Sequence, residues 1–577
     1  MPAADHPAQS HIPRWCIAAA CIIFAAIGMR ASVNFSAALP PGIDAAYYPL
    51  QARALLESGR LAYHDLPLIF WIDAALARVL MLVASMPIDA AVLLASQLVD
   101  SLLQPFAAAF IFALGYAWAG TRRHQTSTLL CVSTCAMLAT ISAPMLRMTG
   151  DFEKNSLGLV WLIAAAWSTF KAFDHGGPWW WATLLLAVVL AALTHVAVLG
   201  TVVLLVGVAL AAQVVGSGHL SFRQILALCA GTCGIAVLLL GLVYLTSPNR
   251  ALALLSAPQI LLGTSGSEQR AGGPPGGLRL DPKVLGITLV TYLAVAWGLV
   301  RLWKDRHFTP PARRSLVIAA AAVTLLLACP FLNGEYAMRL SLMAIVPASI
   351  VLLHALLSRE RLELRIWPAP VIALGSLASV VIGLGWISLP FPGGGPGGPP
   401  GPRRAMGPAP SGDLASDFPG VPPRDASFPP GMGPDRGSDA HGNSAPRRGG
   451  PPQGMMSKVV DDASAQEFLS LRALITEPAT TVVIARHGLQ WWAGYFMKVP
   501  VREERVSPEA LAKYTRVLRL EQKQTRGGPP RGGGGPSDAF APSDARSLAT
   551  ADGKIVHDGT YFTLYEVRSA ATPQEAP

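Results

Sequence analysis

Charged residues are scarce in this chain, and their scarcity decides its class. They make up 14% of the 577 residues, against 52% apolar residues in the broad count, whereas soluble proteins carry about 25% charged residues. Apolar runs long enough to cross a bilayer recur between positions 15 and 389. The composition predicts a polytopic α-helical membrane protein and excludes cytosolic enzymes, secreted disulfide scaffolds and DNA-binding domains.

Cysteine is also rare, with seven residues in the whole chain. Six lie inside apolar runs, Cys329 lies at the end of another, and none follows position 390. Two pairs are spaced four residues apart, which also fits a metal or redox site, but we interpret all seven as small apolar residues packed between helices. We therefore expect no disulfide in the C-terminal part.

The apolar runs predict eleven membrane-spanning helices. The first run lacks a convincing small-residue cleavage site, so it is predicted as a span and not as a signal peptide. The region 178–215 is too long for one crossing and is divided near His195. The predicted spans are 15–33, 89–119, 127–145, 156–173, 178–195, 197–215, 223–245, 283–302, 315–332, 339–357 and 367–388.

The run 66–86 decides the orientation of the chain. It is apolar enough to span, but Asp73 and Arg78 lie in its middle, where a charge is costly unless it is paired or hydrated. If it lies along the outer interface, the most basic loops face the cytoplasm, whereas a spanning helix would turn them outward against the positive-inside rule. These loops are 120–126, 217–223, 301–314 and 358–366. We therefore predict a juxtamembrane helix at 66–86 within an outer loop 34–88, a cytoplasmic N-terminus (1–14) and a C-terminus outside.

The C-terminal part differs in composition. The segment 390–457 is rich in Gly and Pro and is predicted as a disordered tether. A small α/β domain is predicted at 458–570, with a helix at 461–474, strands at 481–486, 516–522 and 561–567, and a second Gly/Pro-rich insert at 525–545. The basic excess, 45 residues against 35, lacks a stripe with interleaved aromatics, so it predicts contact with membrane lipids and not with nucleic acid.

Acidic residues mark two of the predicted outer loops. Asp44 follows the first span, and Asp151 and Glu153 stand two apart before the fourth. Each is interpretable as a solvated or helix-capping residue, but two acidic sites on one face can bind a divalent cation or take up a proton.

Two basic candidates join them on the outer side. Arg339 begins a span, one turn after Glu335. It either pairs with Glu335 or binds a lipid-linked phosphate through its planar fork. His195, at an outer turn, is either a further candidate or a partner in an interhelical hydrogen bond.

These residues, in this order, resemble the GT-C superfamily of membrane glycosyltransferases, and most closely the bacterial and archaeal oligosaccharyltransferase catalytic subunits. The first outer loop of that family carries an Asp, matched here by Asp44, followed by juxtamembrane helices and a long second span. Its second outer loop carries D-x-D or D-x-E, matched by Asp151 and Glu153 in GDFEKN, and a later span opens with a phosphate-binding Arg, matched by Arg339 in MRLSLMAIVP. The C-terminal outer domain also fits the resemblance.

One family signature is incomplete here. Oligosaccharyltransferases carry WWDYG in the outer domain, whereas this chain has Gln490-Trp491-Trp492-Ala493-Gly494-Tyr495. The tryptophan pair is present without the aspartate, so Trp491 and Trp492 are either an acceptor-binding remnant or a buried aromatic pair.

The resemblance implies a GT-C glycosyltransferase of the bacterial inner membrane, with its C-terminus in the periplasm. It would transfer a sugar from a polyprenyl-phosphate or polyprenyl-diphosphate donor to a glycan, lipid or protein acceptor. Asp44 would activate the acceptor, and Arg339 would neutralise the leaving phosphate. Asp151 and Glu153 would hold Mg²⁺ or Mn²⁺ or orient the donor. Whether a metal takes part is left open, because many GT-C enzymes need none. The alternative is a non-catalytic polytopic protein, either a transporter or flippase for a lipid-linked glycan or an assembly scaffold.

Overall fold

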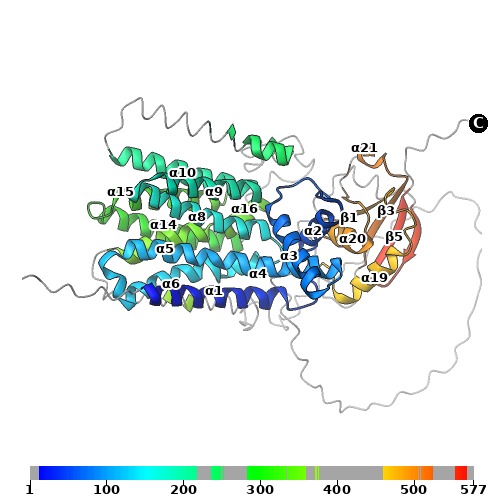
Figure 1. Ribbon diagram of the computed structural model, residues 1–577. Coiled ribbons are helices and arrows are strands. Elements are labelled where there is room, and N and C mark those ends of the chain that lie inside the picture. Colours follow the sequence, from blue (N-terminus) through cyan, green and yellow to red (C-terminus); the bar gives the residue numbers. More distant parts are fainter. Residues whose placement is uncertain are drawn as a thin grey trace, which may run out of the picture.

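A computed structural model gives the fold of the chain. It describes residues 12–217, 282–358 except 333, 459–523 except 505 and 507, and 553–567, with short pieces within 234–252 and 369–375. A bundle of long helices carries a smaller α/β domain at one end (Figure 1). We call this the domain end of the bundle.

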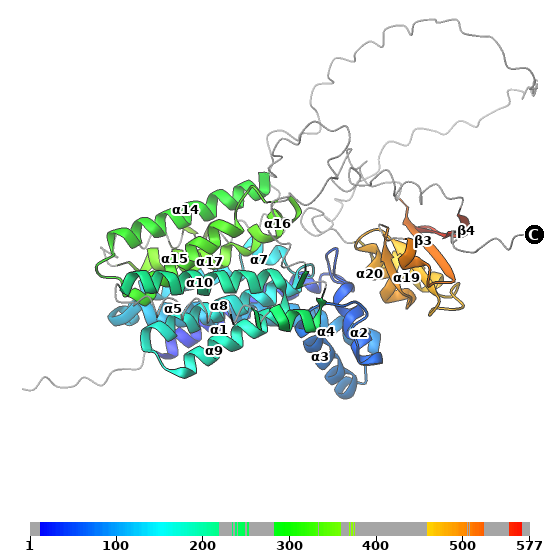
Figure 2. The same ribbon diagram turned by 90° about the horizontal axis from the view of Figure 1, so that it is seen from above.

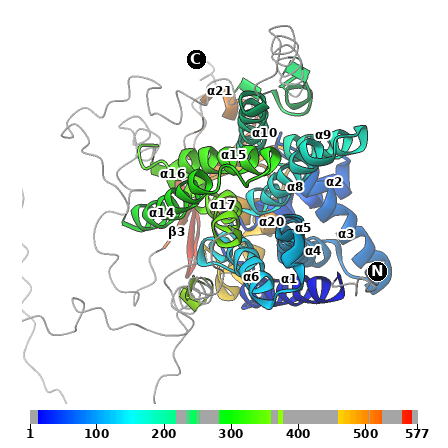
Figure 3. The ribbon, with the colours of Figure 1, turned by 90° about the vertical axis from the view of Figure 1, so that its left-hand side faces the viewer.

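The bundle helices run side by side along one common direction, as Figure 3 shows from the end opposite the α/β domain. A short 3₁₀ turn, η1 (Gln104–Phe106), joins α4 to α5, and η2 (Gly120–His124) follows α5. The helices are α1 (Ile12–Asn34), α4 (Ile88–Leu103), α5 (Ala107–Ala119), α6 (Thr126–Thr140), α7 (Ala143–Arg147), α8 (Glu153–His175), α9 (Pro178–Thr194), α10 (Val196–Ser217), α14 (Pro282–Lys304), α15 (Pro311–Leu327), α16 (Gly334–Met343) and α17 (Ile345–Leu357).

Seven helical stretches of the described chain are long and apolar enough to cross a membrane. They correspond to seven of the eleven predicted spans, whereas α9 and α15, with 17 residues each, are only about 26 Å long. The predictions at 223–245 and 367–388 fall mostly outside the described residues. The seven stretches are Pro13–Asn34, Ile88–His124, Thr126–Arg147, Glu153–His175, Val196–Gly216, Gly286–Lys304 and Met338–Leu357.

Glycine allows close helix contacts in the bundle. A Cβ at Gly158 of α8 would lie 2.3 Å from Val198 of α10, and one at Gly298 of α14 would lie 2.2 Å from Val351 of α17. Small residues let membrane helices approach closely where lipid gives no hydrophobic driving force for their association. These contacts fix the packing of α8 against α10 and of α14 against α17.

The run 66–86 forms α3 (Leu68–Ala84), which lies with α2 (Tyr47–Ser58) at the domain end and leans away from the bundle axis (Figure 2). With 17 residues it is not among the spanning stretches. One face exposes Leu82 (70%) and Val83 (81%), while Asp73 is fully buried. This geometry fits the predicted juxtamembrane helix.

The predicted α/β domain is present. Its sheet has the order β2-β1-β3-β5-β4, with β1 parallel to β2 and β3, and with β5 antiparallel to β3 and β4. The predicted helix and three strands are found. Strands β2 and β4 were not predicted, because β2 has only three residues and neither shows a clear alternation of apolar and polar residues. The predicted tether 390–457 and insert 525–545 lie outside the described residues. The elements are α19 (Asp462–Arg472), β1 (Thr481–Ala485), α20 (Leu489–Met497), β2 (Val501–Glu503), α21 (Pro508–Leu511), β3 (Arg516–Gln522), β4 (Lys554–Asp558) and β5 (Phe562–Val567).

The α/β domain is seated on α2 through the C-terminal half of α20. The guanidinium of Arg53 donates to the carbonyl oxygens of Tyr495 (2.6 Å) and Gly494 (3.1 Å). In return, the Tyr495 hydroxyl donates to the carbonyl of Asp89 (2.6 Å), and Lys498 pairs with the Asp89 carboxylate (2.9 Å). Buried Arg53 thus holds the domain by its main chain.

Candidate functional site

Asp151 holds the loop that carries Asp44. Its Oδ1 accepts hydrogen bonds from the backbone N–H groups of Ile43 (2.9 Å) and Asp44 (3.0 Å). Gly42, with φ +118°, allows this approach, because a Cβ there would lie 2.9 Å from the Cβ of Asp151. The loops that carry Asp44 and Asp151 therefore meet at the domain end of the bundle.

The Asp44 carboxylate receives two side chains of the α/β domain on one oxygen. Trp491 Nε1 donates to Oδ1 (3.1 Å), and His487 Nε2 lies 3.2 Å from the same atom. The Asp44 side chain remains 20% exposed. The site is thus composite, with its carboxylate from the membrane domain and two partners from the α/β domain.

The electrostatics of the two aspartates differ. Burial raises the pKa of Asp44, but the hydrogen bond and charge of His487, the charge of Arg339 and the Trp491 hydrogen bond outweigh it and lower that pKa below its ordinary 3.8. Burial raises the pKa of Asp151, and the nearby charge of Asp44 adds to this, although the two backbone hydrogen bonds and Arg147 oppose it. Neighbouring carboxyls whose pKa values are pushed apart take different roles. Asp44 is therefore the more readily ionised of the two carboxyls, and Asp151 holds the backbone of the loop.

Arg339 lies in α16 at the same end. Its guanidinium is 5.1 Å from the ring of Phe152, the residue after Asp151, and its charge acts on Asp44. The three residues Asp44, Asp151 and Arg339 are therefore brought together. Glu335 lies in the first turn of α16, but its side chain is outside the described part of the structure.

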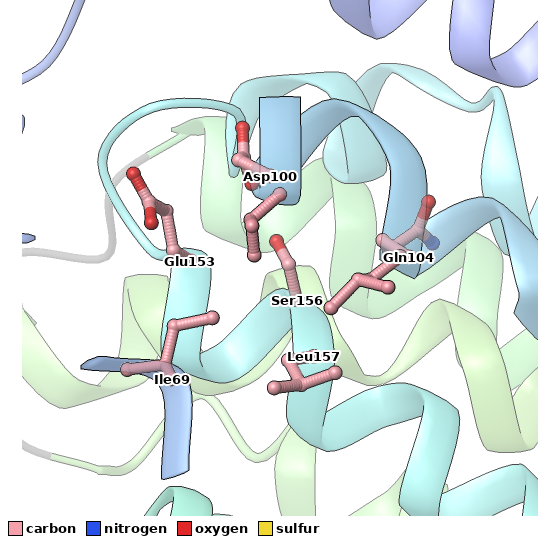
Figure 4. A pocket seen from close by; sticks show the side chains of 8 residues that line it. Ile69, Asp100, Gln104, Glu153, Ser156 and Leu157 are labelled. Atoms are coloured by element: carbon pink, nitrogen blue, oxygen red, sulfur yellow. The ribbon is translucent and has the colours of Figure 1, made fainter. Parts of the chain in front are cut away.

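Glu153 is not placed beside Asp151 as a ligand pair. It begins α8, is 2% exposed and accepts from Ser96 Oγ (2.8 Å) at Oε1. Figure 4 shows it in a small cavity with Asp100 and Gln104 that is too narrow for a water-sized sphere. Within the described residues, no group of three or more His, Cys, Asp or Glu side chains is arranged to hold a metal ion. The loop-to-helix junction turns Asp151 towards the first outer loop and Glu153 towards the bundle interior.

Of the other sequence candidates, His195 and Trp492 have local roles, whereas Trp491 reaches the site. His195 caps α9, and its Nδ1 accepts from the backbone N–H of Ala197 (3.2 Å) at the start of α10. Trp492 is 1% exposed and stacks on Phe496 in the domain core (5.7 Å between centroids). Trp491 instead packs between Tyr47 (4.7 Å) and Tyr63 (5.2 Å). Of the tryptophan pair, one residue is core and the other reaches Asp44.

A buried ion pair that sequence reasoning missed lies inside the bundle, next to the loop that carries Asp151. Arg30 NH2 lies 2.5 Å from Asp100 Oδ1, and both side chains are fully buried. Asp100 Oδ2 accepts from Asn34 Nδ2 and from the backbone N–H of Gly150, each at 2.9 Å. The opposite charges within two predicted spans were the available signal, because an intramembrane charge normally has a partner.

A second missed group lies between α2 and α8. Lys154 pairs with Asp65, the hydroxyl of Tyr47 donates to the same Asp65 oxygen (2.6 Å), and Lys154 lies 5.0 Å from the Tyr47 ring. The only signal for this group in the sequence was that Lys154 directly follows the acidic motif. The pair ties the outer loop to the start of α8.

Asp73 is a buried acid with neither oxygen hydrogen-bonded within the described residues. Burial, followed by the charge of Asp100, raises the pKa of Asp73 well above its ordinary 3.8. The folded protein therefore retains a proton that the unfolded chain releases, so this group's contribution to stability falls as the pH rises from about 3.8 towards the raised pKa.

Replacing Asp73 by Asn, which resembles the protonated acid in size, is expected to keep or raise stability at neutral pH and to flatten this decline. Thermal unfolding of the detergent-solubilised protein across a pH series measures both effects. The exposed Asp174→Asn serves as control. A steeper decline in Asp73→Asn than in the parent protein contradicts the assignment.

Neither a protein-family model nor a curated protein matches the chain.

Proposed function

We propose that the protein is an integral membrane glycosyltransferase of the GT-C type, working on the periplasmic face of a bacterial inner membrane. The observation that carries this proposal is the placement of the Asp44 carboxylate, which contacts His487 and Trp491 and feels the charge of Arg339. It lies at one end of a bundle of membrane-length helices, where the α/β domain is seated (Figure 1). A carboxylate and a guanidinium at the membrane surface suit a reaction in which a hydroxyl is deprotonated and a phosphate leaves.

The donor follows from this location. Nucleotide sugars stay in the cytoplasm, whereas a polyprenyl carrier can present a sugar at the outer interface. The acceptor hydroxyl gives its proton to Asp44 as its oxygen bonds to C1 of the sugar. The C1–O bond to the carrier breaks, and the polyprenyl phosphate or diphosphate leaves with the bonding electrons towards Arg339. Attack from the face opposite the leaving group inverts C1.

The described carboxylates do not form a three-ligand set, so no step is assigned to Mg²⁺ or Mn²⁺. Glu153 accepts a hydrogen bond from Ser96 of α4 inside the bundle, and Asp151 positions Asp44 by its backbone. In this scheme Arg339 stabilises the negative charge of the leaving phosphate.

A gene-deletion strain tests the proposal directly. We expect the polyprenyl-linked sugar to accumulate and one surface glycan, glycolipid or glycoprotein to lack that sugar, as mass spectrometry of both fractions measures. Purified protein in liposomes with a synthetic polyprenyl-phosphate sugar should restore transfer to an extract of the deletion strain. Unchanged glycans in both fractions would contradict the proposal.

A proton-coupled transporter or flippase for a lipid-linked glycan is the second candidate. It is favoured by the buried Arg30, Asp73, Asp100 and Glu153 within or against the bundle, because intramembrane ionisable residues often mark transport pathways. Movement of a labelled lipid-linked sugar across liposomes without formation of a new glycosidic bond would select it.

A further inference from the structure

His487 lies where α/β sheets commonly hold their ligands. It follows β1, whose parallel neighbours are β2 on one side and β3 on the other. The chain passes from β1 through α20 to β2, then through α21 to β3 on the opposite side. Ligands of open α/β sheets bind at the carboxyl ends of the strands at such a switch point. Here the carboxyl end of β1 faces Asp44.

The backbone beside His487 is shaped to reach the membrane domain. Gly488 has φ +85°, and a Cβ there would lie 2.7 Å from Ile43 Cγ2 and 3.1 Å from the Ile43 carbonyl oxygen. Only glycine fits this approach without displacing one of the two segments. The turn therefore contacts the loop that carries Asp44 directly, and this contact brings His487 to Asp44.

The imidazole of His487 is held between two carboxylates. Its Nε2 lies 3.2 Å from Asp44 Oδ1, and its Nδ1 lies 3.9 Å from Glu503 Oε1 at the end of β2. Among the described residues of the α/β domain, His487 and Trp491 contact Asp44, and both contacts fall on Oδ1. Oδ2 is therefore the oxygen that we assign to the acceptor.

We propose that His487 is a positioning residue for Asp44: it fixes the carboxylate by Oδ1 when the α/β domain is seated, so that sugar transfer requires the seated domain. This inference rests on the function proposed above. It gives the α/β domain a defined part in the reaction, since the base is correctly oriented only when the domain is in place.

The charges around His487 set its pH behaviour. The hydrogen bond to Asp44 raises the pKa of His487 above its ordinary 6.5 against the effect of burial; the charges of Asp44 and Glu503 raise it further, and that of Arg339 lowers it. The imidazole is charged below this raised pKa and becomes neutral above it. Transfer by the unmodified protein should therefore weaken on the alkaline side, as the ion pair is lost.

The experiment uses full-length protein in liposomes with the polyprenyl-linked sugar donor. His487→Ala should lower kcat by about 10- to 100-fold, the range of one hydrogen bond to a charged group. His487→Gln, whose amide N–H can replace the imidazole donor, should retain most of this activity. The control His175→Gln, an exposed histidine at the opposite end of α8, should match the parent protein.

Two pH readouts separate positioning from mere support of the fold. In His487→Ala the acidic limb of the kcat profile should move to higher pH, because His487 no longer lowers the pKa of Asp44. In His487→Gln the alkaline decline should disappear. If Ala and Gln lose activity equally with an unmoved acidic limb, or if the Gln variant keeps the alkaline decline, the inference is wrong. Full activity of His487→Ala with loss in Asp44→Asn overturns this inference alone, whereas full activity in Asp44→Asn overturns the proposed function.

Discussion

Replacing Asp44 by Asn is expected to reduce kcat for sugar transfer by about 10²- to 10⁴-fold, the contribution of a positioned general base. The amide keeps the size of the carboxyl and can accept the Trp491 hydrogen bond at Oδ1. It cannot take up the acceptor proton, so donor binding should persist while bond formation fails. Single-turnover transfer and donor binding, measured on the same liposome preparation, separate the two steps.

The matched control for this variant is Asp174→Asn, which makes the same substitution near the C-terminal end of α8, far from Asp44 along the bundle. It should transfer sugar at the parental rate. A fully active Asp44→Asn would remove the base from the proposed mechanism, because no other described carboxylate contacts His487 and Trp491 together.

The second large effect concerns stability. Replacing Arg30 by Met should lower the free energy of unfolding by about 3–5 kcal/mol, because it leaves the Asp100 charge buried without its partner. Both side chains of the pair are fully buried, so water cannot compensate. Equilibrium unfolding in mixed micelles, followed by tryptophan fluorescence, measures the loss.

The double variant Arg30→Met/Asp100→Leu should regain part of this loss, because it removes both buried charges. Recovery is incomplete, since Asp100 also accepts hydrogen bonds from Asn34 and Gly150. Arg78→Met, on the exposed face of α3, should stay within about 0.5 kcal/mol of the parent. A loss below about 1 kcal/mol in Arg30→Met would show that the pair is not a major source of stability.

The positions of most spans and the α/β domain were predictable, because apolar run length and alternation report directly on helices and strands. The meeting of Asp44, Asp151 and Arg339 was also predictable, since loops assigned to one side of a bundle converge there. Glu153 was not, because a displacement of two residues at the start of a helix rotates a side chain from the loop towards the interior.

Contacts between the two domains were beyond sequence reasoning. His487 contacts Asp44 although more than 400 residues separate them in the sequence, and the local sequence ARHGLQ does not indicate a partner in the first loop. Adjacent Trp491 and Trp492 lie about 100° apart around α20, and the sequence does not say which one faces the core. Arg30 and Asp100 are different, because opposite charges within two apolar runs were a usable signal.

The hydrogen bonds from Arg53 to α20 bear on how the α/β domain could be exchanged. Its guanidinium grasps the peptide oxygens of Gly494 and Tyr495, and peptide oxygens are identical whatever side chains surround them. These two hydrogen bonds therefore do not depend on the side chains of α20, whereas the contacts of the Tyr495 hydroxyl and Lys498 with Asp89 do. Chimaeras that join this bundle to another α/β domain should therefore keep its seat if they retain Tyr495 and Lys498.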